Sequence, residues 1–167
     1  SPGAYGLYIN GKDIKIYHNT ILMNASFVGI SAAAHFENGT GFDVQNNVFV
    51  NSNSTAGVQR LAIYSKVQES SFTSINSNDY FAPKIGYLGG ERTSLNDWKA
   101  ATGKDQNSIS VNPVFVSTLD LHLQSVPGNS LLDNTGADLF ASVPADIDGV
   151  ARTTTPDMGA AEFSAVP

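Results

Sequence analysis

The sequence predicts an all-β fold in which short strands stack in parallel in successive turns of a coiled chain. A phrase made of an aliphatic residue, a polar pair with Asn and a further apolar run occurs three times, the third time more weakly. Its copies span 16–22, 44–50 and 75–81. The key residues Asn19, Asn47 and Asn78 recur at nearly equal intervals. A repeat of about 20–50 residues is typical of stacked architectures, because one unit cannot bury its apolar face alone.

Short apolar segments precede these phrases and are expected to open each turn as strands. They span 6–9, 29–32 and 61–64. Asn-Gly turn signals follow at 10–13 and 37–41, since Asn and Gly both tolerate positive φ. The phrases then alternate apolar and polar residues as strands do. No convincing helix of about 10–15 residues separates them, which argues against a βαβ fold.

The predicted organisation is one domain with three parts. Residues 1–80 are expected to form the stacked turns, and 81–107 an inserted loop with a short helix. Residues 108–167 are expected to form a C-terminal β cap, with strands at 110–116 and 119–124, because stacked folds need an atypical terminal unit.

The inserted helix is predicted from its own capping signals. Ser94 is suited to the N-cap, Asp97 follows three residues later as in a capping box, and Gly103 suits the C-terminus. Trp98 lies on the apolar face with its i±3 neighbours and is expected to be part of the core rather than a sugar platform.

Composition excludes several classes of function. The 167 residues carry a formal charge of −6 with nine scattered basic residues, which argues against a nucleic-acid partner. The absence of cysteine excludes disulfides, thiolate metal sites and a cysteine nucleophile. No apolar run approaches the length that a helix needs to cross a bilayer, so no membrane span is expected.

A set of C-terminal phrases in fixed order resembles a known family. The phrases are Asp-Trp-Lys-Ala-Ala-Thr-Gly at 97–103, Asn-Pro-Val-Phe-Val at 112–116, Leu-His-Leu-Gln at 121–124, Asp-Ile-Asp-Gly at 146–149 and Pro-Asp-Met-Gly-Ala-Ala-Glu-Phe at 156–163. Their order resembles the C-terminal part of bacterial and archaeal secreted right-handed parallel β-helix proteins of the pectate-lyase-like type. The resemblance covers roughly residues 5–163.

This resemblance implies a right-handed single-stranded parallel β-helix of about three turns, or rungs, located outside the cell or at its surface. It implies a polysaccharide or cell-surface glycan as the partner, and a polysaccharide lyase or glycoside hydrolase if the protein is catalytic. Enzymes of this class carry more rungs, so further rungs, including catalytic ones, are expected upstream of Ser1.

Asn19, Asn47 and Asn78 are expected to form a structural ladder. Asn at equivalent corners of a parallel stack can hydrogen-bond from rung to rung and satisfy backbone groups that the bend leaves free. Binding of sugar hydroxyls is the weaker alternative, because repeated identity at a corner is what a ladder requires.

The catalytic candidates are His35, Glu37, Arg60 and Lys66. A lyase needs a base near the sugar C5 proton and a cation, either Arg or Ca²⁺, to neutralise the uronate carboxylate. His35 and Glu37 are two apart on one strand and so share a face, while Arg60 and Lys66 belong to the next rung. The alternative is that all four are ordinary solvated strand residues.

Tyr17, His18, Asp43 and Tyr64 are the candidate substrate-binding residues, since tyrosines offer an apolar ring and a polar tip to sugars. A hydrolase would need paired carboxylates at hydrolytic spacing, and the predicted rungs contain no tight pair, which favours a lyase.

Asp146, Asp148 and Asp157 are weak candidates for Ca²⁺, because Asp-x-Asp-Gly can supply some of the six or more oxygens that this ion takes. Asx-turns and pairing with Arg152 explain these residues more simply, so no cofactor is firmly predicted. The sequence therefore favours part of a secreted polysaccharide lyase or related enzyme. The alternative is a non-catalytic β-helix module that binds glycans or serves as a structural cell-surface element.

Overall fold

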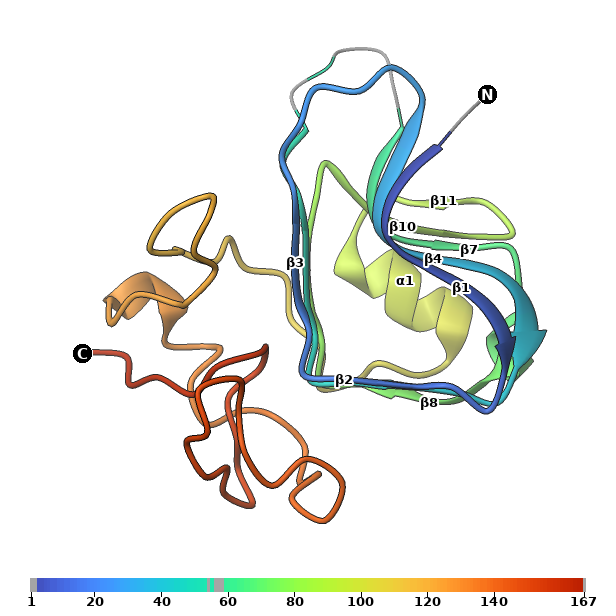
Figure 1. Cartoon of the computed structure of the whole chain (residues 1–167). Coiled ribbons are helices and arrows are strands. Elements are labelled where there is room, and N and C mark those ends of the chain that lie inside the picture. The colour runs from blue at the N-terminus through green and yellow to red at the C-terminus, as the bar shows by residue number, and fades with distance from the viewer. Residues whose placement is uncertain (1–2, 54, 56–58, 167) are drawn as a thin grey trace.

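The computed structural model describes residues 3–53, 55 and 59–166 and is built mostly of strands in three parallel sheets (Figure 1). The first sheet has the order β1-β4-β7-β10-β11, the second β2-β5-β8 and the third β3-β6-β9. Each sheet therefore takes one strand from each of three successive turns of the chain, and the first sheet continues with β10 and the antiparallel strand β11. The expected all-β class and parallel stacking are confirmed.

The strands of the first turn are β1 (Gly3–Lys12), β2 (Lys15–Tyr17) and β3 (Thr20–Met23). Those of the second are β4 (Ile30–Thr40), β5 (Phe42–Gln45) and β6 (Val48–Asn51), and those of the third are β7 (Arg60–Ser65), β8 (Phe72–Asn76) and β9 (Asp79–Phe81). Then follow β10 (Lys84–Leu88), β11 (Glu91–Arg92) and the helix α1 (Leu95–Thr102), with 3₁₀ turns at Glu69–Ser71 and Pro127–Asn129.

The core lies between the sheets and is filled with aromatic and aliphatic side chains. Phe36, Phe42 and Phe72 come from three strands, and Phe36 contacts the other two edge-on, with ring centroids 5.1 and 5.0 Å apart. All three are buried. Such offset aromatic contacts stabilise the interior beyond the area that they bury.

The corner between the second and third sheets is formed by a residue with positive φ followed by an asparagine. His18, Asn46 and Ser77 have φ values of 53°, 59° and 53°. Each directly precedes a ladder asparagine. The left-handed conformation turns the chain sharply, so the repeated phrase sets both the corner and its spacing.

The register of the first sheet differs from the one that the sequence suggested. Tyr5 pairs with Ala32 and Leu7 with Ala34, which aligns Gly6 with Ala33 rather than with Gly29. The Asn-Gly pairs are also not the turns: β1 and β4 run through them, with Asn10 opposite Asn38 and a register shift before it. A Cβ at Gly39 would lie 1.6 Å from the Gly11 carbonyl oxygen, so these glycines allow the two strands to approach closely.

The inserted helix is confirmed. Ser94 caps α1 and forms a capping box with Asp97, and Gly103 ends it in the left-handed conformation. Trp98 is buried against Tyr80, with ring centroids 6.0 Å apart. The predicted loop 81–107 also contains β10, which pairs in parallel with β7 and continues the first sheet.

The C-terminal strands predicted at 110–116 and 119–124 are wrong. Within the described residues 108–166 no strand forms, and the backbone bonds belong to turns, loops and isolated bridges such as that between Phe115 and Leu123. This segment packs against the outside of the third sheet through an apolar cluster that contains Val48, Leu132 and Met158 (Figure 1). The third sheet already supplies the apolar surface on which this segment packs, so the segment buries its apolar side chains without forming a sheet of its own.

Candidate functional site

A row of four aromatic side chains crosses the first sheet, and we call it the Tyr-His row. It consists of Tyr8, His35, Tyr64 and Tyr87 from β1, β4, β7 and β10, which are direct partners in the parallel register. Successive ring centroids lie 5.1, 4.9 and 4.9 Å apart. In-register parallel strands place equivalent residues about 4.8 Å apart, which is why neighbouring rings are in contact, stacked for Tyr8 and His35 and tilted for the other two pairs.

His35 is the covered member of this row. Its neighbour Phe36 points into the core, so the His35 side chain points to the other side of β4, where the rings of Tyr5, Tyr8 and Tyr64 surround it. Only 1% of the residue is exposed. Burial lowers the pKa of His35, although Glu37 partly opposes this, and the neutral ring donates from Nε2 to Glu37 at 2.7 Å. Its Nδ1 has no partner among the described residues.

Glu37 joins His35 to Lys66. The Lys66 Nζ lies 2.9 Å from Oε1 and 2.8 Å from Oε2 of Glu37. Hydrogen bonding by Lys66 and then by His35 lowers the pKa of Glu37, and Glu37 in turn raises the pKa of Lys66. At neutral pH Lys66 is therefore a cation without a free basic nitrogen, and Glu37 is an anion made less basic by the hydrogen bonds at both of its oxygens.

The fourth catalytic candidate, Arg60, does not join this group. It lies four residues before Tyr64 on β7, about 13 Å along the strand. Its Nη1 donates to the Asn53 carbonyl at 2.8 Å. The structure thus brings His35, Glu37 and Lys66 together and leaves Arg60 at the other end of the strand.

The predicted substrate-binding residues lie in two different sheets. Tyr64 belongs to the Tyr-His row, whereas Tyr17 and Asp43 lie on β2 and β5 of the second sheet. The Tyr17 hydroxyl donates to Asp43, whose other oxygen accepts from Gln45 Nε2 at 2.7 Å. Burial and this bond raise the pKa of Tyr17. One glycan contacting a single face of the protein would not meet all of these residues.

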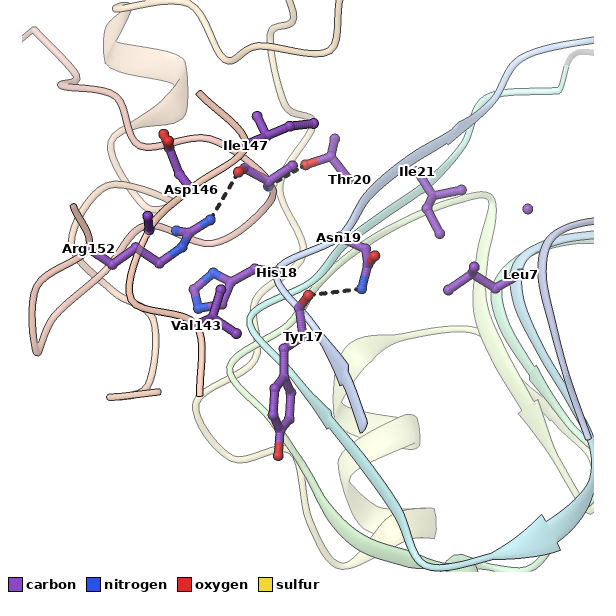
Figure 2. A pocket seen from close by; sticks show the side chains of 13 residues that line it. Leu7, Tyr17, His18, Asn19, Thr20, Ile21, Val143, Asp146, Ile147 and Arg152 are labelled. Atoms are coloured by element: carbon purple, nitrogen blue, oxygen red, sulfur yellow. Dashed lines mark hydrogen bonds between the residues drawn. The ribbon is translucent and has the colours of Figure 1, made fainter. Parts of the chain in front are cut away.

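His18 lies at a groove of about 490 Å³ between the β2–β3 corner and the C-terminal segment (Figure 2). Its Nδ1 donates to the Gly159 carbonyl at 3.3 Å, and its Nε2 accepts from Asn46 Nδ2 at 3.0 Å. Burial, followed by the nearby charge of Arg152, lowers its pKa to about 4. One ring nitrogen thus attaches the C-terminal segment to the stack, and the other bonds to the equivalent corner of the next turn.

The ladder residues hydrogen-bond from rung to rung. The backbone N and the Nδ2 of Asn19 donate to Asn47 Oδ1 at 3.0 and 2.9 Å. The same two groups of Asn47 donate to Asn78 Oδ1 at the same distances. The bonds between Asn47 and Asn78 run inside the corner, where both residues are buried, whereas Asn19 at the start of the ladder is only partly buried.

The acidic residues near the C-terminus hold backbone amides. Asp146 accepts from the amides of Asp148, Val150 and Glu162, at 2.9, 2.8 and 2.7 Å. Both oxygens of Asp157 accept backbone N–H groups as well, and Asp148 pairs with His122 at 2.8 Å. Across the described residues, no group of three or more His, Cys, Asp or Glu side chains is arranged to hold a metal ion.

Two buried carboxyls had no role in the sequence interpretation. Asp79 lies under the C-terminal segment, where Oδ1 accepts from the Val111 amide at 2.9 Å and burial raises its pKa to about 8. Asp105 accepts from Trp98 Nε1 at 2.6 Å and from the Tyr80 hydroxyl at 2.9 Å. Their positions next to a ladder asparagine and after a helix C-cap gave no sign of burial, since Asp is common in such turns.

Comparison with known proteins adds no relative. The chain matches no family model, no curated protein and no solved structure. Among the described residues, no helix has the length and apolar character needed to cross a membrane.

Proposed function

We propose that this chain is a right-handed parallel β-helix module that binds a polysaccharide or cell-surface glycan outside the cell without cleaving it. Three parallel sheets fed by successive turns support the β-helix, and right-handed winding is the general rule for parallel connections. The Tyr-His row is the observation that carries the binding function. It presents tyrosines from neighbouring rungs on one face of a rigid sheet.

The row offers two kinds of contact to a sugar. Tyr8 lies beside the rings of His35 and Tyr5, at centroid distances of 5.1 and 6.0 Å, yet remains 58% exposed, so the exposed part of its ring can pack against sugar C–H groups. Tyr64 and Tyr87 stack on their neighbours and contribute ring edges and hydroxyl groups. Because parallel rungs repeat about every 4.8 Å, a glycan chain running across the strands would meet several tyrosines in turn.

The charges near the row favour a neutral glycan. Lys66 is bound to Glu37, and Lys84 at the next rung is paired with Glu91 at 2.5 Å. These cations are therefore already neutralised, and the chain as a whole carries a charge of −6. A polyuronate would be repelled rather than held.

Binding is favoured over the lyase reaction by the state of the two basic groups. A lyase base must reach the sugar C5 proton in its deprotonated form. His35 is neutral, but it is covered by tyrosine rings and its Nε2 is bound to Glu37. Lys66 reaches solvent, but its pairing with Glu37 favours the protonated form.

The test is affinity electrophoresis of the protein through gels that contain neutral or uronic-acid polysaccharides. We expect retardation by a neutral polysaccharide, and we expect Tyr8→Ala and Tyr64→Ala each to weaken it about tenfold, the loss of one good aromatic contact. Tyr17→Phe, in another sheet, is the matched control and should bind normally. Equal binding by all three variants, or no retardation by any polysaccharide, would contradict the proposal. Release of unsaturated sugars would instead support a lyase.

A further inference from the structure

The two ends of the strand stack are finished differently. At one end, α1 covers the interior with the buried Trp98, and β11 turns back antiparallel on β10. The asparagine ladder also ends there. The backbone N–H of Asn78 donates to Ser108 Oγ at 2.8 Å, where the earlier turns have the Oδ1 of an asparagine. At the other end, β1, β2 and β3 are the edge strands of their sheets.

The apolar interior is partly open at this edge. Leu7, Ile14, Ile21 and Met23, all from the first turn, pack on the core but remain partly exposed. Their counterparts one turn later, such as Ala34, Phe42 and Phe49, are fully buried because the first turn covers them. A further turn laid on β1–β3 would cover the first turn in the same way.

The asparagine ladder shows which hydrogen bonds would join a further turn to the first one. Oδ1 of Asn47 accepts the backbone and side-chain N–H groups of the asparagine one turn before, and so does Oδ1 of Asn78. Nδ2 of Asn47 donates back to the Ile16 carbonyl, and that of Asn78 to the Val44 carbonyl. Asn19 has neither interaction with any described residue. Its Nδ2 already donates to the Tyr17 carbonyl and to Asn47 Oδ1, at 3.0 and 2.9 Å. Asn19 therefore presents to the free edge the acceptor Oδ1 that, in the later turns, binds the asparagine of the turn before.

The backbone of β2 and β3 also has N–H and C=O groups that face the free edge and could bond to a further strand. The carbonyls of Asn19 and Met23 accept from the second turn, from Val48 and Ser52, each at 2.8 Å. In a parallel ladder, alternate residues bond to opposite sides, so the N–H and C=O groups of Thr20 and Leu22 face the free edge. By the same alternation, with Asp43 N bonded to Ile14 O, the backbone groups of Lys15 face it too.

A groove runs alongside this edge (Figure 2). One wall is Asn19, Thr20 and Ile21, and the other comes from the C-terminal segment, with Val143 and Ile147. Ile147 is 71% exposed. The groove has room for the outward side chain of a strand added beside β3, at the position that Thr20 and Val48 occupy in the turns present.

We propose that this edge binds another polypeptide turn, with its strands parallel to β2 and β3 and an asparagine at its corner that donates to Asn19 Oδ1. The partner is recognised by the chemistry of the Asn phrase itself, aliphatic residues flanking a polar corner. This inference does not depend on glycan binding, because it uses the rung edge and not the Tyr-His row.

The probe is a synthetic peptide with the sequence of residues 41–53, which contains the phrase around Asn47. We expect it to bind the intact chain and to slow hydrogen exchange of the Thr20 and Leu22 amides. The same peptide with Asn47→Ala should bind about tenfold more weakly, since it keeps the backbone N–H but loses the side-chain donor to Asn19 Oδ1. The chain variant Lys15→Pro should fold normally, because that N–H is unpaired in the free protein, and should lose the peptide.

Equal binding of the two peptides, protection at other strands, or no binding would each overturn the proposal. So would protection of the edge amides in the free chain that grows with protein concentration, because that result would place a second copy there. Affinity electrophoresis of the Lys15→Pro variant in polysaccharide gels tests glycan binding separately, because this substitution alters the rung edge and not the Tyr-His row.

Discussion

The strand stack of residues 3–92 and the C-terminal segment of residues 108–166 satisfy their backbone groups in different ways. In the stack, the backbone pairs with itself in parallel sheets, and the corners are completed by one repeated residue type. In the segment, scattered backbone bonds of turns and isolated bridges are supplemented by individual side chains that bind further amides and carbonyls. Asn129 accepts from the Val114 amide at 2.8 Å and donates to the carbonyls of Val114 and Gln124 at 2.9 and 2.8 Å.

The difference shows what each kind of structure needs from its sequence. A stack needs the same residue type at the equivalent position of every rung, because each rung bonds to the next through that position. An irregular segment needs a suitable polar side chain wherever a buried amide or carbonyl lacks a partner. The junction between the regions uses both, since Asn46 at a repeated corner also binds the amide and carbonyl of Ala137 at 2.7 and 2.8 Å.

Asn47→Ala should be the most damaging change and would break the stack at its centre. It removes the acceptor for two N–H groups of Asn19 and the donor to Ile16 and Gln45. We expect a loss of about 4 kcal/mol in the free energy of unfolding, measured with urea, since buried partners remain unsatisfied. Asn24→Ala, at an exposed asparagine, is the control and should change stability by less than about 0.5 kcal/mol.

Acid should next weaken the junction through His18. Its folded pKa of about 4 lies below its unfolded value of about 6.5, so the neutral form is favoured by folding. The stabilisation is complete above about pH 6.5 and is lost as the pH falls toward 4, by about 2–3 kcal/mol. Chemical unfolding across this range checks the loss, and His18→Asn, which tolerates the positive φ, should reduce it. An NMR titration midpoint near 6.5 for His18 would contradict this explanation.

Asp79→Asn should act in the opposite pH direction. The folded pKa of about 8 exceeds the unfolded value of about 3.9, so stability falls as the pH rises between these values. Asparagine has the same shape and no charge. The stability gain of the variant over wild type should be larger at pH 8 than at pH 5 by about 3 kcal/mol, measured by urea unfolding at both pH values. An equal difference at the two pH values would show that Asp79 is ionised when folded.

Asn46→Gly should separate the two regions with the smallest cost. Glycine keeps the positive φ, so the change removes mainly the side-chain bonds to Ala137 and His18. We expect a loss of about 1.5 kcal/mol and faster hydrogen exchange confined to the C-terminal segment. Uniformly faster exchange, including β4 and β7, would mean that the segment and the stack unfold as one unit.

Much of the stack could be predicted from local signals. The corner phrases around Asn19, Asn47 and Asn78 combine a left-handed residue with an amide side chain, and the helix carries both of its caps in its own sequence. The register of the first sheet could not be predicted. It depends on the close contact at Gly39 and on a shift after Ile9, which pairs of strands decide together.

The site shows the same division. That His35 and Glu37 share one side of a strand follows from alternation, and their hydrogen bond agrees with it. That tyrosines from other strands cover His35, and that Arg60 lies at the far end of β7, depended on the register and could not be seen in any single segment.

The sequence by itself determined the coil of parallel strands, its asparagine corners and the capped helix, because these depend on residues close together or repeated at a fixed spacing. The tertiary structure alone decided which side chains are covered, which carboxyls are buried and how residues 108–166 attach to the third sheet. Burial and long-range hydrogen bonds depend on what lies opposite a residue in space, and the order of the chain does not specify that neighbour.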